Sequence, residues 1–172
     1  MVRMPLDAVA RLMLDEAGEL PARVLVIDDA GGALTTEVAA SGREVRTYCD
    51  DLRDAEAIPP ALRLDTLADP FVAAADLVLL RLPASLAELE DDCDALISAG
   101  PRAGLRVVTG GRIKHMTRGQ NDVLAARFAE VHASLGRQKC RVLHAAGPLG
   151  TPPRWPAARE LPGLGLVVWA HG

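Results

Sequence analysis

The sequence contains few aromatic residues and no closely spaced pair of cysteines. Aromatic side chains make up 3% of its 172 residues, so the core has to be built mainly from aliphatic side chains. The cysteines Cys49, Cys93 and Cys140 are far apart and odd in number, which excludes a disulfide framework and a CxxC zinc site. The histidines lack metal-ligand spacing as well. We therefore expect no metal site, and cysteines that pack as small apolar side chains in a reducing compartment.

Several motifs and segment types are also missing. No apolar run is long enough to span a membrane, and the start of the chain lacks the apolar core of a signal peptide. Without a Gly-x-Ser-x-Gly elbow or a P-loop, a serine hydrolase or an NTPase has no support. The hydrophobic content of 49% suits a folded domain, and the net charge of −4 does not by itself indicate nucleic-acid binding. We expect a soluble, cytoplasmic protein.

The most informative stretch is an apolar run, Val24 to Ile27, that ends in an acidic pair and two glycines. An unbroken β-branched run bounded by turn residues is typical of a buried parallel strand. Asp28, Asp29, Gly31 and Gly32 then form the strand-to-helix turn of a nucleotide-binding unit. Glycine lets the backbone approach a ligand, and an acid there can accept a hydrogen bond from a ribose hydroxyl or an amine. These four residues are candidates for cofactor binding.

A second candidate is Asp50, which follows the predicted strand Glu44 to Cys49. An acid at the end of the second strand can hold the ribose of a cofactor. The simpler interpretation is that aspartate is common in turns, and both stay open. The glycine turn itself is incomplete because Ala30 stands at the first glycine position. We therefore expect a weak or closed cofactor pocket.

Helical and strand patterns alternate along most of the chain. Helices are predicted over 5–17, 32–40, 86–97 and 117–136. Strands are predicted over 23–28, 44–49, 76–82, 105–109, 138–145 and 164–170. A weak strand or turn is predicted over 62–67, and a Pro-rich loop over 147–162. This order predicts an α/β fold, a mostly parallel sheet with helices on both faces. The last two strands have no helix between them, which predicts an antiparallel pair at the C-terminal end.

Basic residues gather in two places late in the chain. One group lies in the loop after strand 105–109, where ligands bind in open α/β sheets; the other alternates along strand 138–145 and so shares one face. They are Arg112, Lys114 and Arg118 in the loop, and Arg137, Lys139 and Arg141 on the strand. All are candidates for contact with RNA phosphates. The alternatives are a solvated loop and charges that protect an edge strand.

Several segments together resemble a known family. They are 14–16 (Leu-Asp-Glu), 24–29 (Val-Leu-Val-Ile-Asp-Asp), 32–34 (Gly-Ala-Leu), 79–83 (Leu-Leu-Arg-Leu-Pro), 86–96, 111–115 (Gly-Arg-Ile-Lys-His) and 167–172. Over most of its length the chain is similar to the N-terminal domain of bacterial two-domain ribosomal RNA guanine-N2 methyltransferases. The resemblance implies a Rossmann-like class I methyltransferase fold and one domain, residues 1–172, that forms the N-terminal half of a longer enzyme.

In that family the C-terminal copy carries the S-adenosylmethionine site and an Asn-Pro-Pro-Tyr motif. The N-terminal copy is a degenerate duplicate that supports RNA placement or folding of the catalytic half. Here Arg81 to Ala84 occupies the Asn-Pro-Pro position, and arginine has no acceptor for a guanine amino group. The resemblance therefore implies a chain with no catalytic residues and no bound cofactor of its own. Its implied partners are ribosomal RNA and the C-terminal catalytic domain, with no membrane.

Two other functions stay open at this point. The chain could be a small S-adenosylmethionine-dependent methyltransferase that uses Asp28, Gly31 and Asp50. It could also be a protein-interaction module that pairs through an edge strand.

Overall fold

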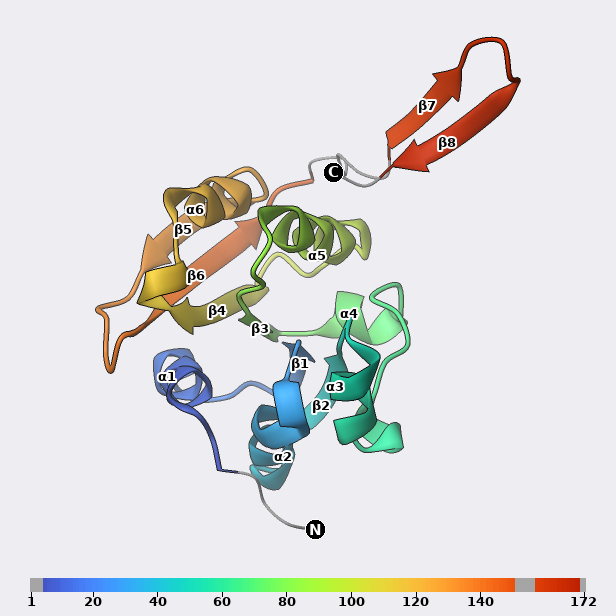
Figure 1. Ribbon diagram of the computed structural model, residues 1–172. Coiled ribbons are helices and arrows are strands. Elements are labelled where there is room, and N and C mark those ends of the chain that lie inside the picture. The colour runs from blue at the N-terminus through green and yellow to red at the C-terminus, as the bar shows by residue number, and fades with distance from the viewer. Residues whose placement is uncertain (1–4, 151–156, 171–172) are drawn as a thin grey trace.

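The protein is seen in a computed structural model that describes residues 5–150 and 157–170 (Figure 1). Its main sheet has six strands in the order β2-β1-β3-β4-β6-β5. In that spatial order they are β2 (Glu44–Tyr48), β1 (Arg23–Ile27), β3 (Leu77–Arg81), β4 (Arg106–Arg112), β6 (Cys140–Pro148) and β5 (Phe128–Ala133). The pairs from β2 to β4 are parallel, whereas β6 is antiparallel to both β4 and β5. The expected mostly parallel α/β sheet is confirmed.

Helices cover both faces of this sheet, as expected. They are α1 (Ala8–Ala17), α2 (Ala33–Ala40), α3 (Leu52–Ala57), α4 (Pro70–Ala74), α5 (Leu86–Ser98) and α6 (Arg118–Ala125), with 3-10 turns η1 (Ala30–Gly32), η2 (Pro60–Leu62) and η3 (Ile113–His115). Alternate residues of β1 point to opposite faces. Val24 and Val26 pack with α1 and α2, while Leu25 and Ile27 face the core that includes α4, α5 and α6. No helix of the described residues is long and apolar enough to cross a membrane.

Local signals placed several helix starts correctly. The Ser85 hydroxyl accepts hydrogen bonds from the amides of Ala87 and Glu88 at the start of α5. A capping box of Thr117 and Gln120 opens α6, at the predicted start of that helix. The segment 62–67, predicted as a weak strand or turn, makes a single bridge from Arg63 to Thr47 of β2.

The predicted long helix 117–136 is wrong. Helix α6 ends at Ala125, and Phe128–Ala133 is strand β5, paired with β6. The helical spacing placed Phe128 and Leu135 on one buried face, yet Phe128 is 1% exposed and Leu135 is 87% exposed. Because β6, the next strand along the chain, offers backbone partners to this segment, strand pairing overrides the local helical periodicity.

The predicted stripe of basic residues on one strand is also wrong. Gln138 and Lys139 both have positive φ, of 50° and 62°, and form a tight turn. Arg137 and Cys140 close that turn with two reciprocal backbone hydrogen bonds of 2.9 and 2.8 Å. Two central residues with positive φ match the twist of a hairpin. Strand β6 therefore begins at Cys140, and of the three stripe residues it contains Arg141 alone.

The expected antiparallel pair at the C-terminal end is present, but with another partner. Strand β8 (Leu166–Ala170) pairs with β7 (Ala157–Leu161) in a separate two-stranded sheet. Strand β7 lies inside the segment predicted as a Pro-rich loop, and the strand expected to pair with β8 is β6, which belongs to the main sheet. In Figure 1 this hairpin lies apart from the main sheet.

Candidate functional site

The carboxyl ends of β1, β2 and β3 meet around a small depression of about 470 Å³. It is lined by Asp28, Asp50, Asp51, Asp54, Arg81, Leu82, Pro83 and Glu88. The structure thus brings two of the predicted cofactor residues together: the Asp50 amide donates a hydrogen bond of 3.1 Å to Oδ1 of Asp28. Asp28 adopts the left-handed conformation, with φ of 60°, which aspartate tolerates better than most residues.

The depression is strongly acidic. Burial raises the pKa of the Asp28 carboxyl above its ordinary value, and the charges of Asp50 and Asp54 add to the rise, while the amide of Asp50 opposes it. The pKa of Glu88 is raised by burial and then by Asp28 and Asp50. Carboxylates that raise one another's pKa favour a cationic neighbour and repel an anionic one.

Asp29, the third predicted acid, has a structural role in this fold. Its carboxylate is 1% exposed and accepts hydrogen bonds from the amides of Leu34 and Thr35 and from the Thr35 hydroxyl. The Thr35 hydroxyl also contacts the hydroxyl of Thr47 on β2 at 2.8 Å. The carboxylate therefore holds the start of α2 and the neighbouring strand, and it does not line the acidic depression.

The two predicted glycines form the turn η1 and the start of α2. Gly31 and Gly32 have φ of 79° and 71°, which only glycine adopts freely. A Cβ on Gly32 would lie 3.1 Å from the carbonyl oxygen of Ala57 and 3.2 Å from Cδ1 of Ile58. The end of α3 therefore packs directly against Gly32, whereas Gly31 faces open space.

Arg81, at the Asn-Pro-Pro position, is bound to the N-terminal helix. Its Nη2 donates a 2.5 Å hydrogen bond to Oδ2 of Asp7, the N-cap residue of α1. Arg81 also borders a second depression, of about 330 Å³, that reaches Arg112 and His115 at the end of β4. The carboxyl edge of the sheet is thus acidic beside β1 and β2, and basic beside β4.

The predicted RNA-binding residues gather at the end of the sheet formed by β4, β6 and the turns beside them. Gly111 is in register with Arg141, and the amide of Ile113 donates to the carbonyl of Lys139 at 2.9 Å. Arg112, expected in a loop, is the last residue of β4, and Lys114 lies in η3. Both segments therefore run beside the turn that carries Lys139. Arg118 is the first residue of α6. Nη1 of Arg137 lies 3.8 Å from Oδ2 of Asp15 on α1. All of the predicted basic residues are exposed, and their contact with RNA stays a prediction.

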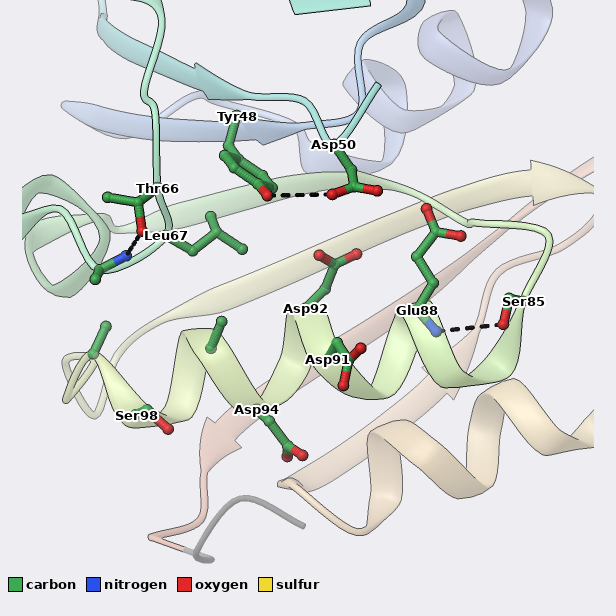
Figure 2. A pocket seen from close by; sticks show the side chains of 13 residues that line it. Tyr48, Asp50, Thr66, Leu67, Ser85, Glu88, Asp91, Asp92, Asp94 and Ser98 are labelled. Carbon is green, nitrogen blue, oxygen red and sulfur yellow. Dashed lines mark hydrogen bonds between the residues drawn. The ribbon is translucent and has the colours of Figure 1, made fainter. Parts of the chain in front are cut away.

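A larger acidic cleft was not predicted from the sequence. It lies between α5, the end of β2 and the loop 66–68, and it contains the buried carboxylate of Asp92 (Figure 2). The available signal was the four-residue spacing of Glu88 and Asp92, which places both acids on one face of α5. Leu89 and Cys93 define the neighbouring apolar face of this helix.

Comparison with known proteins agrees with this geometry. The family described as "RLMG N-terminal domain" matches residues 5–148. "Ribosomal RNA large subunit methyltransferase G" of Pseudomonas fluorescens is 34% identical over 154 residues, which cover 80% of this chain and 40% of the relative. The protein of that name from Pseudomonas putida is 33% identical over 174 residues, which cover 91% of this chain and 45% of the relative. The chain spans less than half the length of these curated relatives.

Solved structures show the same fold at lower identity. A T. thermophilus 16S rRNA N2 methyltransferase, in complex with AdoMet and guanosine, has a TM-score of 0.65 and 19% identity, and the match covers 94% of this chain and 45% of that one. A TehB-like SAM-dependent methyltransferase from Corynebacterium glutamicum has a TM-score of 0.57 and 14% identity, over 82% and 89% of the two chains. The expected Rossmann-like methyltransferase fold is confirmed. The resemblance to the N-terminal part of ribosomal RNA methyltransferases is confirmed as well, and the chain belongs to the RLMG N-terminal domain family.

Proposed function

We propose that residues 1–172 form a single methyltransferase-like domain that is the non-catalytic N-terminal half of a ribosomal RNA (guanine-N2) methyltransferase. In this role it helps to place the RNA and supports a C-terminal half that binds S-adenosylmethionine and carries out the transfer. The names of the curated relatives and of the guanosine-bound fold neighbour support ribosomal RNA as the substrate class. We propose a cytoplasmic location because the proposed substrate is ribosomal RNA.

Arg81 is the observation that carries the non-catalytic assignment. By resemblance, a catalytic copy has an Asn-Pro-Pro motif at the end of this strand, whose acceptor holds the guanine amino group. Guanidinium has only hydrogen-bond donors, and its positive charge opposes attack on a cationic methyl donor. Asp7 holds the Arg81 side chain in this place.

The glycine turn supports a chain that binds no S-adenosylmethionine of its own. Ala30 replaces a glycine, and Gly32 is already in contact with Ala57 and Ile58. The space over Gly32 that a cofactor needs for close backbone approach is therefore filled by the protein.

The basic end of the sheet supports a role in RNA placement. Arg112, Lys114, Lys139 and Arg141 belong to adjacent backbone segments and are exposed. Contacts of such side chains with phosphates fix the position of an RNA without reading its sequence.

The β7–β8 hairpin supports contact with a C-terminal half. It lies beyond the residues of the family match, and its Leu166 and Trp169 side chains are 55% and 65% exposed. An isolated two-stranded hairpin is at best marginally stable in water, so these apolar side chains need a partner surface. We infer that the C-terminal catalytic half provides it.

The test is methyl transfer from labelled S-adenosylmethionine to deproteinised large-subunit ribosomal RNA. We expect no transfer by this chain and clear transfer by the full-length Pseudomonas putida relative, assayed in parallel as the positive control. Calorimetry should detect no tight binding of S-adenosylmethionine to the chain. Methylation by the chain that depends on Asp28 or Asp50 would overturn the proposal in favour of a small methyltransferase.

A further inference from the structure

The acidic cleft beside α5 is a feature of the surface that the proposed function does not use. Its volume is about 900 Å³, and its acidic lining is Asp50, Glu88, Asp91, Asp92 and Asp94. Lysine, arginine and histidine are absent from the lining as far as the described residues show. The walls therefore carry acidic groups and no basic side chain, which favours a cationic ligand over an anionic one.

The cleft is elongated because its residues follow one side of α5. Glu88 and Asp92 are about one helical turn apart, and Ala95 and Ala99 continue the same side for about two further turns, at 1.5 Å per residue. Leu67 faces α5 across the cleft (Figure 2). Carboxylates thus line the part of the cleft beside Glu88 and Asp92, and apolar side chains line the part beside Ala95 and Ala99.

Asp92 holds a buried hydrogen-bond acceptor that no donor of the described residues reaches. The residue is 7% exposed, and its Oδ2 has no hydrogen-bond partner among the described residues. In Figure 2 its carboxyl group points from α5 toward Asp50 and Tyr48. A buried acceptor without a donor is unfavourable, so a ligand that donates a hydrogen bond here gains affinity.

Asp92 also differs from its neighbour Asp94. The Asp94 carboxylate accepts a 2.6 Å hydrogen bond from Nε of Arg127, so a basic residue of the fold already compensates it. Asp92 is surrounded instead by the carboxylates of Asp28, Glu88, Asp50 and Asp91. Burial raises the pKa of Asp92 to about 8, and these four charges add to the rise. Burial thus favours the protonated carboxyl, and a cation beside it would favour the ionised form.

The arrangement of groups points to an organic cation. Among the described residues, no group of three or more His, Cys, Asp or Glu side chains is placed to hold a metal ion. The apolar wall of Leu67, Ala95 and Ala99 suits methylene groups, and the carboxylates suit ammonium groups. We propose that the acidic cleft is a binding site for a linear aliphatic polyamine, with one ammonium group bonded to Asp92 and another to Glu88 at the cleft mouth. The site is independent of the proposed role in RNA placement, since it uses none of the basic residues.

The test is isothermal titration of the chain with spermidine at constant ionic strength. We expect one binding site, and about tenfold weaker binding or more in Asp92→Asn, which keeps the shape of the side chain and removes its charge. Glu88→Gln should also weaken binding, and it supplies the test if Asp92→Asn fails to fold. Asp122→Asn, an exposed acid on α6 outside the cleft, is the matched control and should bind as the wild type does.

Proton release gives a second, independent measurement. Binding of an ammonium group favours ionised Asp92, so at neutral pH spermidine should displace up to about one proton from the wild type and fewer from Asp92→Asn. Titrations in two buffers with different ionisation enthalpies measure this number. Equal weakening by Asp122→Asn, or displacement of spermidine by magnesium at the same ionic strength, would reduce the effect to general charge attraction and overturn the proposal. Displacement by S-adenosylmethionine would assign the cleft to that cofactor instead.

Discussion

Arg81, the last residue of β3, donates a hydrogen bond to the carboxylate of Asp7, which at the same time accepts the Ala10 amide at 2.8 Å and caps α1. One carboxylate therefore starts a helix and attaches it to a strand that is 74 residues away. Burial by itself would raise the pKa of Asp7, but the bond from Arg81 and the amide bonds outweigh it, so that this pKa lies below 3.8. Arg81 is thus part of the structural framework that joins α1 to the sheet.

Asp7→Asn and Asp7→Ala should separate the two roles of this carboxylate. Asn keeps an acceptor for the cap, and the partly exposed ion pair contributes within about 1 kcal/mol, so its loss should be small. Ala also loses the cap, which lowers the free energy of unfolding by about 1 kcal/mol more. Urea unfolding measures both. Because the folded pKa is lowered, the contribution of the ion pair is present above the unfolded pKa, and it should vanish as the pH falls below about 4. Equal stability of the two variants would contradict the capping role.

Asp92→Asn should stabilise the protein at neutral and alkaline pH. The pKa of Asp92 rises from 3.8 to about 8 on folding, so between these values the folded protein keeps a proton that the unfolded chain releases. The free energy of unfolding therefore falls as the pH rises through this window, by at most about 1.36 kcal/mol per pH unit. Asn does not titrate, and thermal unfolding of the variant at about pH 5 and about pH 8 should show a smaller difference. An unchanged pH dependence would mean that Asp92 is already ionised in the fold.

Arg127→Met should strongly destabilise the contact between α5 and α6. Arg127 and Asp94 are each 8% exposed at their side chains and joined by a 2.6 Å bond. Removal of the arginine leaves the buried Asp94 carboxylate without this partner, which lowers the free energy of unfolding by about 3 kcal/mol or more. The double variant with Asp94→Leu should recover most of the loss, and the exposed Arg118→Met should change stability by less than about 0.5 kcal/mol. Equal losses in the single and double variants would assign the effect to packing alone.

Lys139→Glu combined with Arg141→Glu should weaken RNA binding. We expect the chain to bind ribosomal RNA fragments weakly and with little sequence preference, because contacts with phosphates carry the interaction. The plot of log affinity against log salt should become flatter by about one unit per lost contact. Arg43→Glu with Arg53→Glu changes the net charge equally on either side of β2, the opposite edge strand of the sheet, and is the matched control. If both pairs lower affinity equally, the basic end is not a binding surface and the charges serve edge protection.

Contacts between residues close in sequence could be predicted correctly. The continuous apolar runs in β1 and β3 are buried strands, and α5 begins at its Ser85 cap. The position of the turn at Gly31 and Gly32 was also predicted correctly. This turn requires positive φ, which glycine adopts without contacts from distant residues.

The candidate site was only partly predictable. The meeting of Asp28 and Asp50 followed from their places at the ends of two parallel strands. The sequence alone could not distinguish the acid that lines the depression from Asp29, which binds α2, because the two residues are adjacent and chemically identical. The environment of Asp92 on α5 could not be predicted either, because the neighbouring charges of Asp28 and Asp50 follow β1 and β2.

The sequence by itself determined the order of most strands and helices, the apolar residues that pack on both faces of the sheet, and the family. Only the tertiary structure decided that Phe128–Ala133 is a strand, that Arg137 and Lys139 lie in a turn, and that Arg81 is bound to Asp7. The physical reason is that periodicity and capping act within a few residues, whereas strand pairing and buried charge depend on groups brought together by the whole fold.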